Sequence, residues 1–395
     1  MGMGLAFTAV ANDPSAIFFN PAGLGWQKHF ESQLGSSLLT KTEGDFVGEN
    51  PYPGASNREN EHKTTFVVPT LYAVVPLTPE INLGLGTFSQ YGLGFRWDNA
   101  ETFSGRFIAQ NAVIQSVDVN PVISFQATPA IAVAVGADYR VSKVQLERNQ
   151  AAINPFTNSV VDVAHIKLNS DILDNHGWGW NAGIMVRPIS QLSFGAAYRS
   201  SIKVDYEGRA TFQQRLTGNA QFDAIVGSQL PTGSHPVTTS IDFPSSLNLG
   251  AALTLPGDLT ISGDADWTEW KKFASLDIIF PDLVGRDLHR QTVWKNSWAY
   301  RVGIEKKFSN LAVRAGYYRD NTPQPVEDAG PILADNDRNA YAIGFGYGND
   351  RWGVDVSDLY IKFKKLDTAG GSHDNFFGQY KESANIFAFS LRLSF

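Results

Sequence analysis

Large apolar side chains alternate with small or charged ones along most of the chain beyond the first 27 residues. Between 191 and 207, Leu192 and Tyr198 fall on one face, whereas Gly195 and Arg199 fall on the other. Successive side chains of a β-strand point to opposite faces, so this alternation predicts one strand, longer than the ~6 residues usual in globular proteins. The same alternation places Lys203 and Asp205 on the face of Arg199.

Three further stretches, 131–141, 297–305 and 340–347, alternate in the same way. In each of them one face is large and apolar, and the other face is small or charged. A water-soluble barrel carries its large apolar residues inside. Here the small or charged face suits a crowded or wet interior, and the aromatic face suits lipid. The pattern therefore predicts an all-β fold, a transmembrane antiparallel β-barrel.

Turn signals between the alternating stretches predict the number of strands. Six short connections lie near 77–80, 128–129, 187–190, 256–258, 308–310 and 348–350, and seven longer polar loops lie near 42–62, 97–110, 149–165, 208–240, 273–291, 321–337 and 365–383. Thirteen connections predict 14 strands with both termini on the short-turn side. Apolar residues spaced three or four apart within 208–240 also predict a short helix in that loop.

The first 27 residues do not alternate and are rich in small and apolar side chains. We therefore expect two parts: a small N-terminal plug, here called the hatch, at 1–27 inside the lumen, and the barrel at 28–395. Within the hatch, Pro21 fixes its own φ and pushes Asn20 toward an extended backbone. The Asn20 amide is then free to bond backbone groups of the wall. The alternative is a plain Asn-Pro turn that leads into the first strand.

The third predicted strand, near 81–95, loses its regular alternation part of the way along. Leu83 and Leu85 point toward lipid, and strict alternation then puts Thr87 and Ser89 toward lipid and Phe88 into the lumen. The next residues are Gln90, Tyr91, Gly92 and Leu93. Polar residues on a lipid face followed by glycine indicate a bulge or a break in pairing. A harmless bulge near the membrane interface is the alternative.

Composition narrows the function classes. The 395 residues carry 32 Lys and Arg against 39 Asp and Glu, a net charge of -7, which argues against nucleic acid as a partner. The absence of cysteine rules out disulfides and thiolate sites. The seven histidines show no metal spacing, and no Gly-x-Ser-x-Gly elbow is present, so we expect neither an enzyme nor any metal or cofactor.

The two ends of the chain bear on its location. Met1 is followed by glycine and methionine rather than by a basic, then apolar leader, so the sequence shows no signal peptide. The chain is then either cytoplasmic or a mature form, and the barrel pattern favours the second. The last strand places Phe387, Phe389 and Phe395 on the lipid face. Outer-membrane barrels resemble this at their C-terminus, where the assembly machinery reads the last strand.

Several segments together resemble the FadL-type long-chain fatty acid transporters of Gram-negative outer membranes, whose relatives move aromatic hydrocarbons. They are the hatch from Gly2 to Leu24, the stretch 177–184 with Tyr198-Arg199-Ser200, and Asp320 to Pro323 with 335–338. The resemblance spans nearly the whole chain. It implies capture at extracellular loops, a lumen pocket, and sideways release through a kink in the third strand beside Asn20-Pro21-Ala22. Family members carry further residues before the segment that matches Gly2.

Ligand contacts follow from the resemblance and from alternation. The apolar candidates are Leu5, Phe7, Phe18, Phe19 and Phe88; for all but Phe88, which faces the lumen by alternation, the alternative is that they only pack the hatch. The basic candidates for a carboxylate are Arg140, Arg199, Lys203, Arg301 and Arg314, which alternation turns inward, and Arg148, which lies where the family places a basic residue. The alternative for these is pairing with inward Asp138, Asp205, Asp264, Asp266, Glu305 and Asp355.

The sequence thus predicts a passive outer-membrane transporter for long-chain fatty acids or similar hydrophobic molecules. Neutral or aromatic hydrocarbons are the alternative substrates. A lipase-like barrel enzyme and an adhesive or structural barrel are alternatives of another class. We expect a monomer in contact with lipid bilayer and lipopolysaccharide, with no nucleic acid.

Overall fold

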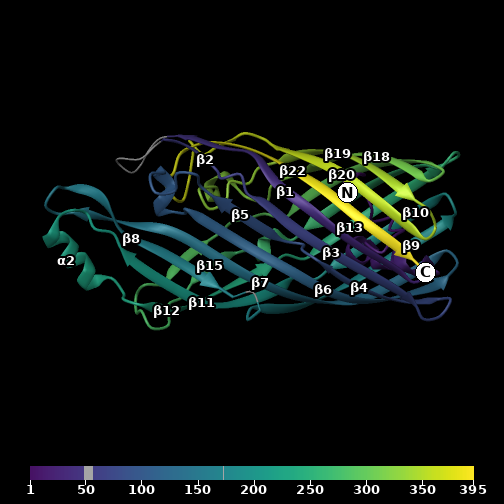
Figure 1. Cartoon of the computed structure of the whole chain (residues 1–395), viewed down its shortest axis with the longest axis horizontal. Helices are drawn as coiled ribbons and strands as arrows, with labels where there is room; N and C mark the ends of the chain where they lie inside the picture. Colours follow the sequence, from purple (N-terminus) through teal and green to yellow (C-terminus); the bar gives the residue numbers. More distant parts are fainter. Residues whose placement is uncertain (49–56, 172) are drawn as a thin grey trace.

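The computed structural model describes residues 1–48, 57–171 and 173–395, which form a closed antiparallel β-barrel (Figure 1). The barrel closes where β22 (Gly378–Ser394) pairs with β1 (Glu31–Gly48), the last strand against the first. The predicted 14 wall strands are confirmed, and four of them are each split into two ladder segments. No helix of the described residues is both long and apolar enough to cross a membrane.

The wall strands follow one another in chain order. After β1 they are β3 (Thr65–Pro76), β4 (Ile81–Phe88) with β5 (Gly92–Arg96), β6 (Asn111–Thr128), β7 (Ile131–Asn154), β8 (Ser159–Ser170) with β9 (His176–Ile189), β10 (Leu192–Arg199) with β11 (Ile202–Gln214), β12 (Ser234–Phe243) with β13 (Ser246–Leu255), β14 (Leu259–Thr268), β17 (Ser297–Phe308), β18 (Leu311–Asp320), β19 (Arg338–Gly348), β20 (Trp352–Phe363) and β22.

Smaller elements lie outside this ladder. They are β2 (Arg58–Asn60), β15 (Ser275–Ile278), β16 (Leu288–Gln291), β21 (Leu366–Asp367), the helices α1 (Ala16–Phe19) and α2 (Ala220–Gln229), and the 3-10 turns η1 (Pro21–Trp26), η2 (Ser104–Phe107), η3 (Trp270–Lys272) and η4 (Val326–Asp328). The predicted short helix near 208–240 is confirmed as α2, which buries Phe222 and Val226.

The six short connections are confirmed, at 77–80, 129–130, 190–191, 256–258, 309–310 and 349–351. The long loop predicted at 149–165 is wrong, because β7 and β8 continue as a hairpin to residues 154 and 159. Polar side chains misled the prediction, since this hairpin stands beyond the apolar band and needs no lipid-facing residues. Residues 49–56 of the predicted loop 42–62 lie outside the described part of the chain.

Four neighbouring strands extend past the barrel rim on the left of Figure 1 and carry α2 at their end. They are β7, β8, β11 and β12, which continue to pair with one another beyond the rim. The outward side chains of β7 are apolar from Val133 to Val141 and then polar at Lys143, Gln145 and Glu147. The membrane-spanning band of this strand therefore ends near residue 142.

The side-chain faces are as predicted wherever a strand is continuous. In β17, Trp298 and Tyr300 are exposed on the outer surface, whereas Arg301 and Gly303 face the lumen. The single strand predicted from 191 to 207 is wrong: it is split at Ser200 and Ser201, and the faces exchange there. In β11, Ile202, Val204 and Tyr206 are buried, so Lys203 and Asp205 are exposed and form an ion pair, contrary to the prediction.

Residues 1–27 run along the inner face of the wall, where inward glycines make room for their backbone. A Cβ added to Gly316 of β18 would lie 2.1 Å from the Gly4 nitrogen. A Cβ added to Gly303 would lie 2.5 Å from the Met3 carbonyl oxygen, and one added to Gly195 would lie 2.3 Å from that of Thr8. The small inward face of the strands is therefore needed for this contact.

Candidate functional site

The third wall strand is interrupted between β4 and β5, as the sequence predicts. Phe88 pairs with Asp118 of β6, and the next pair joins Gly92 to Gln115. Ser89, Gln90 and Tyr91 have no ladder partner, and they lie opposite only two β6 residues. Thr87 is still paired on both sides, and Leu93 pairs on one side only; the Leu93 side chain is outside the described part of the structure.

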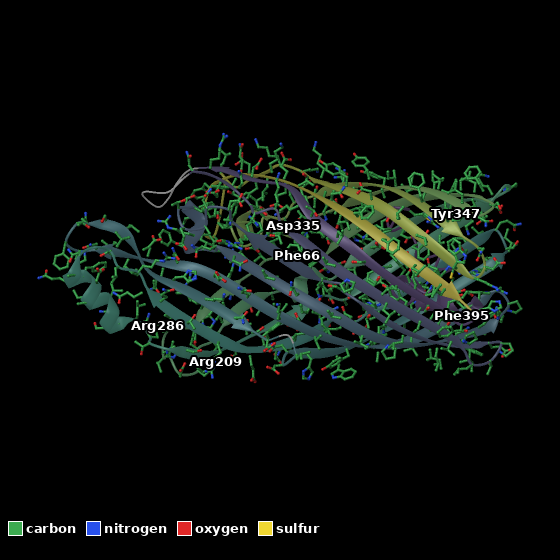
Figure 2. The ribbon with its side chains drawn as sticks, viewed as in Figure 1. Phe66, Arg209, Arg286, Asp335, Tyr347 and Phe395 are labelled. Atoms are coloured by element: carbon green, nitrogen blue, oxygen red, sulfur yellow. The ribbon has the colours of Figure 1, made fainter. Side chains whose placement is uncertain are left out.

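The interruption leaves a gap in pairing between the second and third wall strands. Their last shared pair is Leu71 with Thr87, so 65–70 of β3 pair only with β1 and β5 pairs only with β6. Val67 in this stretch is 65% exposed on the outer surface, which places the gap in the apolar band. A ring covers it: a Cβ on Gly94 would lie 1.9 Å from the phenyl ring of Phe66, labelled in Figure 2.

The predicted place of Asn20 beside the third strand is wrong. The Asn20 amide nitrogen donates to the carbonyl oxygen of Ile184 on β9 at 3.1 Å and to that of Thr8 at 3.0 Å. Its Oδ1 accepts from the Ala22 N–H and so caps η1, where Pro21 is the first residue. Asn20 ends helix α1, and each helical residue turns its side chain by ~100°. The side chains two and three positions earlier therefore face a different strand.

Those earlier residues are the ones that touch the third strand. Ile17 packs on Gly84 and Gly86 of β4, and the Phe18 ring stands edge-on to the Phe88 ring at 5.0 Å. Of the predicted apolar contacts, Phe18 and Phe19 line a cavity, and Phe88 is buried beside them. Leu5 packs in another cluster beside β18, β19 and β20, and Phe7 packs in a cluster with Met3 and Val10.

Besides Arg314, which pairs with Glu305 and Asp355, three of the predicted basic residues are already paired inside the barrel. The Arg140 Nε donates to Asp118 at 2.8 Å, and both side chains are at most 1% exposed. Arg199 pairs with Asp138 and also donates to the carbonyl oxygen of Phe18 at 3.4 Å. Arg301 pairs with Asp266. These groups stabilise the wall and the hatch as charge networks, which was the alternative reading of the sequence.

Arg148 differs from these three arginines. Its Nη1 donates to the carbonyl oxygen of Phe107 at 3.5 Å, and no carboxylate of the described residues forms an ion pair with it. Burial lowers the pKa of the guanidinium, which nevertheless stays charged at neutral pH. Arg148 lies beyond the apolar band of β7, on the same strand face as Val144 and Leu146.

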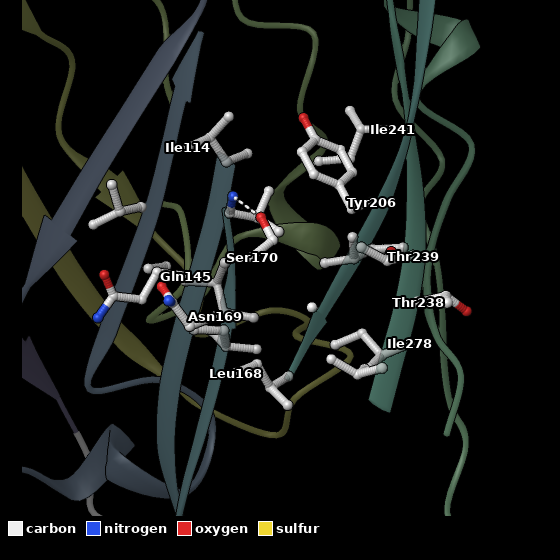
Figure 3. A pocket seen from close by; sticks show the side chains of 18 residues that line it. Ile114, Gln145, Leu168, Asn169, Ser170, Tyr206, Thr238, Thr239, Ile241 and Ile278 are labelled. Carbon is white, nitrogen blue, oxygen red and sulfur yellow. Dashed lines mark hydrogen bonds between the residues drawn. The ribbon is translucent and has the colours of Figure 1, made fainter. Parts of the chain in front are cut away.

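Val144 and Leu146 line an apolar cavity of about 90 Å³ in the part of the barrel nearer the long loops, here called the outer cavity (Figure 3). Ile114, Leu168, Tyr206 and Ile241 point into the same space from β6, β8, β11 and β12, and Ile278 of β15 closes it from the loop side. Two residues along a strand is ~7 Å, so Arg148 lies one such step beyond the cavity wall.

A second, smaller cavity of about 30 Å³ lies against the hatch and is here called the inner cavity. Its lining combines rings and polar groups: Phe18, Phe19, Gln90, Asn181, Arg199 and Asn248. The Oδ1 atom of Asn181 is buried and has no hydrogen-bond partner among the described residues. The two cavities and the gap at Phe66 all lie along one side of the barrel.

Comparison with known proteins identifies the family. The family model described as outer membrane protein transport protein (OMPP1/FadL/TodX) matches residues 1–395. The chain belongs to this family. It is therefore an outer-membrane transport protein with a multi-pass barrel, and not an enzyme.

Its relatives within the OMPP1/FadL/TodX family are distant in sequence. The long-chain fatty acid transport protein of Escherichia coli O6:H1 is 22% identical over 94% of this chain and 86% of its own length. Outer membrane protein P1 of Haemophilus influenzae is 22% identical over 100% of this chain and 93% of its own length. These relatives cover nearly the whole chain.

Solved structures of the same family share the fold. A Pseudomonas aeruginosa FadL homologue superimposes with a TM-score of 0.82 at 20% identity, over 100% of this chain and 96% of its own. The P. putida toluene transporter TodX gives a TM-score of 0.73 at 17% identity, over 97% and 94%. At these identities the likeness establishes the barrel architecture alone.

Sequence reasoning missed most of the outer cavity in this family member. Tyr206 was assigned to the lipid face, because the exchange of faces at Ser200 and Ser201 was not recognised. Two consecutive serines inside an otherwise apolar alternation were the available signal. Phe66 gave no signal at all, since its role depends on Gly94 in another strand.

Proposed function

We propose that this protein is a passive transporter that carries long-chain fatty acids across the outer membrane. The ligand enters the outer cavity from the long-loop end, passes to the inner cavity beside the hatch, and leaves sideways through the gap between the second and third wall strands. The observation that carries the proposal is the apolar outer cavity with the unpaired Arg148 one step beyond it.

The chemistry of the outer cavity fits an acyl chain. Most of its lining side chains are apolar, so an alkyl chain gains by leaving water there, at about 0.8 kcal/mol per buried methylene. No bond has to be broken, because a hydrophobic molecule needs only a continuous low-energy path. The P. putida toluene transporter TodX and the Ralstonia pickettii toluene transporter TbuX have the same fold, so a neutral hydrocarbon is the alternative ligand.

Arg148 is the feature that favours a carboxylate over a neutral ligand. Arg140, Arg199 and Arg301 already have carboxylate partners and would have to give them up. Arg148 donates only a long bond to a backbone carbonyl, so a ligand carboxylate improves its pairing without breaking an ion pair. The head group would then lie at the upper end of the cavity, with the chain running down toward the hatch.

The first experiment measures uptake of labelled palmitate by a Gram-negative host that lacks its own transporter of this family and exports this chain. We expect uptake above the empty host. Absence of any uptake of palmitate or of a neutral hydrocarbon would contradict transport and favour an adhesive or structural barrel.

Substitution of Arg148 separates the two substrate classes. In Arg148→Met, we expect binding of a fatty acid to weaken about tenfold, the value of one charge-assisted hydrogen bond, and binding of its methyl ester to stay unchanged. Arg209→Met is the matched control, because Arg209 is exposed on the outer face of β11 (Figure 2). Equal binding of acid and ester by the unsubstituted protein would favour neutral hydrocarbons as substrates.

The hatch is proposed to control the inner end of the path. Asn20, Pro21 and Ala22 hold the turn between α1 and η1, and the Asn20 amide ties that turn to Ile184. Because Ile17 and Phe18 of the same turn cover β4 beside the gap, a movement of this segment would uncover the exit. Asn20→Leu removes all three hydrogen bonds of the Asn20 side chain and tests this: we expect faster uptake with the barrel intact.

Further partners follow from the outer surface. Phe395 is 76% exposed, and its ring lies 5.9 Å from that of Phe30 beside the closing strand pair (Figure 2). We propose that this terminal ring is presented to the outer-membrane assembly machinery. The exposed apolar band is expected to contact the bilayer and lipopolysaccharide, with the protein as a monomer.

A further inference from the structure

The two cavities are separated by one layer of side chains, here called the partition, made of Tyr91, Asp118, Arg140 and Phe243. On β12 and β13, Ile241 lines the outer cavity and Ser246 lines the inner cavity, with Phe243 between them. On β7, Val144 lines the outer cavity, and Arg140 lies four residues, or two such steps, further toward the short turns. At the break in the third strand, Gln90 borders the inner cavity. Tyr91 packs in one cluster with Ile114, which lines the outer cavity.

Tyr91 crosses the lumen within this layer. Its hydroxyl donates to the carbonyl oxygen of Pro244 at 3.1 Å, so the third wall strand is bonded to the eighth, several strands away around the barrel. The Tyr91 ring lies 5.3 Å from the ring of Phe243 and 5.9 Å from that of Trp270. The side chain therefore spans the space that a ligand has to pass between the two cavities.

Arg140 forms the floor of the partition and is fixed. Its guanidinium carbon lies 4.9 Å from the centre of the Tyr91 ring and 4.7 Å from that of Phe243. Two bonds hold it: Nε donates to Asp118 at 2.8 Å, and Nη2 donates to Gln90 at 2.9 Å. A buried, ion-paired guanidinium is costly to displace, so Arg140 is a wall of the passage rather than its moving part.

The backbone of Phe243 is held by a strand ladder, but the backbone of Tyr91 is not. Phe243 is buried, and its backbone pairs with Ile202 of β11. Tyr91, by contrast, belongs to the three residues of the third strand that have no ladder partner. Its carbonyl oxygen accepts from the hydroxyl of Ser116 at 2.6 Å in place of a strand partner. A side chain on unpaired backbone can swing while the ladders on either side stay intact.

We propose that Tyr91 is the gate between the outer and inner cavities, and that a ligand passes when the Tyr91 ring leaves Pro244 and Phe243. The proposal rests on the proposed transport function, to which it adds the residue that sets the rate of passage. It also gives the break in the third strand a second role. The same three unpaired residues border the lateral gap and carry the gate.

Two variants test the gate in the uptake assay. Tyr91→Phe keeps the ring and loses the bond to Pro244, together with the long bond of 3.4 Å that the Gln90 amide donates to the hydroxyl. We expect uptake of palmitate to rise about two- to tenfold, the range for one neutral hydrogen bond. Tyr91→Ala removes the ring, and we expect a larger rise. Binding of a fluorescent fatty acid, cis-parinaric acid, is expected to change less than about twofold, because the outer cavity is untouched. Tyr317→Phe is the matched control, since the Tyr317 hydroxyl bonds Asn339 on the opposite, lipid-facing surface.

A second readout does not depend on the substrate. The chain has no cysteine, so Ser246→Cys places a single thiol in the inner cavity and Thr239→Cys places one in the outer cavity (Figure 3). Each cysteine is then combined with Tyr91→Ala. We expect the thiol in the inner cavity to react severalfold faster with a maleimide, and the thiol in the outer cavity to react at an unchanged rate.

The outcomes separate the gate from the function. One outcome would overturn the gate and leave transport standing. In it, the unsubstituted protein takes up palmitate, both Tyr91 variants do so at the same rate, and the Ser246→Cys thiol reacts at an unchanged rate. Slower uptake and a less stable barrel in Tyr91→Phe, but not in Tyr317→Phe, would make Tyr91 a structural brace and also overturn it. In a third outcome, no form takes up palmitate, but the Ser246→Cys thiol reacts faster with maleimide in Tyr91→Ala. This result would support the closed partition and reject the transport function.

Discussion

The two sides of this barrel are built differently. On one side, here called the regular half, β14, β17, β18, β19, β20 and β22 each run as one unbroken strand. On the other side, here called the interrupted half, the third, sixth, seventh and eighth wall strands are each split in two. Both cavities, the partition and the lateral gap lie in the interrupted half. The regular half contains the hatch contacts at Gly303, Gly316 and Gly344.

The difference shows what each half contributes. An unbroken ladder satisfies every backbone group of a strand, which is the condition for stability in lipid. A break leaves groups to be satisfied by side chains, as Ser116 does for Tyr91, and it changes which residues face the lumen. We infer that the regular half supplies stability and a seat for the first residues of the hatch, Gly2 to Gly4. The interrupted half supplies space and movement for the ligand.

The largest effect is expected from a buried charge in the interrupted half. Arg199→Met leaves Asp138 buried without its cation, and we expect a loss of about 3–5 kcal/mol in the free energy of unfolding in lipid vesicles. Lys203→Met, only four residues away on the exposed side of the break, is the matched control and should not change stability measurably. The double variant that carries Arg199→Met and Asp138→Leu is expected to recover most of the lost stability. Equal effects of Arg199→Met and Lys203→Met would contradict the assigned faces.

The seat of the hatch in the regular half gives the next effect. Gly316→Ala puts a methyl group 2.1 Å from the Gly4 nitrogen, and we expect a loss of about 1–3 kcal/mol, because two backbones must separate. Gly263→Ala is the control, since the nearest atom to its added Cβ is 3.7 Å away. The measurement is again unfolding in vesicles. Equal stability of the two variants would mean that the N-terminal segment does not rest on β18.

The lateral gap predicts a smaller, functional effect. Phe66→Ala removes the ring that covers Gly94, and we expect faster palmitate uptake with little change in ligand binding. Val67→Ala is the control, because Val67 is the next residue of the same strand and faces lipid. If Phe66→Ala leaves uptake unchanged, the ring does not limit release and the gap is closed elsewhere.

The smallest effect is a pH dependence in a loop of the regular half. Burial alone would raise the pKa of Asp337, but the bonds that it accepts from Lys364 and the Thr322 N–H outweigh burial and lower it. A lowered carboxyl pKa stabilises the loop fully above the unfolded value of about 3.9, and this stability is lost as the pH falls through the lower folded value.

Proteolysis of the segment 321–337 as a function of pH checks this prediction. Cleavage should accelerate below about pH 4 in the natural chain, and Asp337→Asn should remove most of that dependence. A pH profile that is the same in both forms would show that Asp337 does not anchor the loop.

The sequence predicts the regular half well. Alternation there follows a single ladder, so the inward places of Arg301, Arg314 and Glu305 are correct, as is the strand number. It also locates the break at Ser89 to Tyr91, because polar residues and glycines replace the apolar alternation.

The rest could not be read from the sequence for a physical reason. One extra residue in a strand exchanges its faces. The two serines at Ser200–Ser201 are only a weak signal of such an insertion, and Pro244–Ser245 has no strong local signature. Contacts such as Tyr91 with Pro244 or Phe66 with Gly94 join strands far apart in the sequence. The position of Asn20 beside β9 depends on the path of the hatch through the lumen, which no local pattern encodes.

The most direct test of the interrupted half as the path is deletion of Gln90. Ser89, Gln90 and Tyr91 lie opposite two residues of β6, so the deletion equalises the two strands and allows continuous pairing. Gln90→Ala is the control, because it removes the same side chain and keeps the break. We predict that the deletion variant folds and binds cis-parinaric acid but no longer takes up palmitate, whereas Gln90→Ala retains uptake. Uptake by the folded deletion variant at the rate of the natural chain would contradict passage through the interrupted third strand.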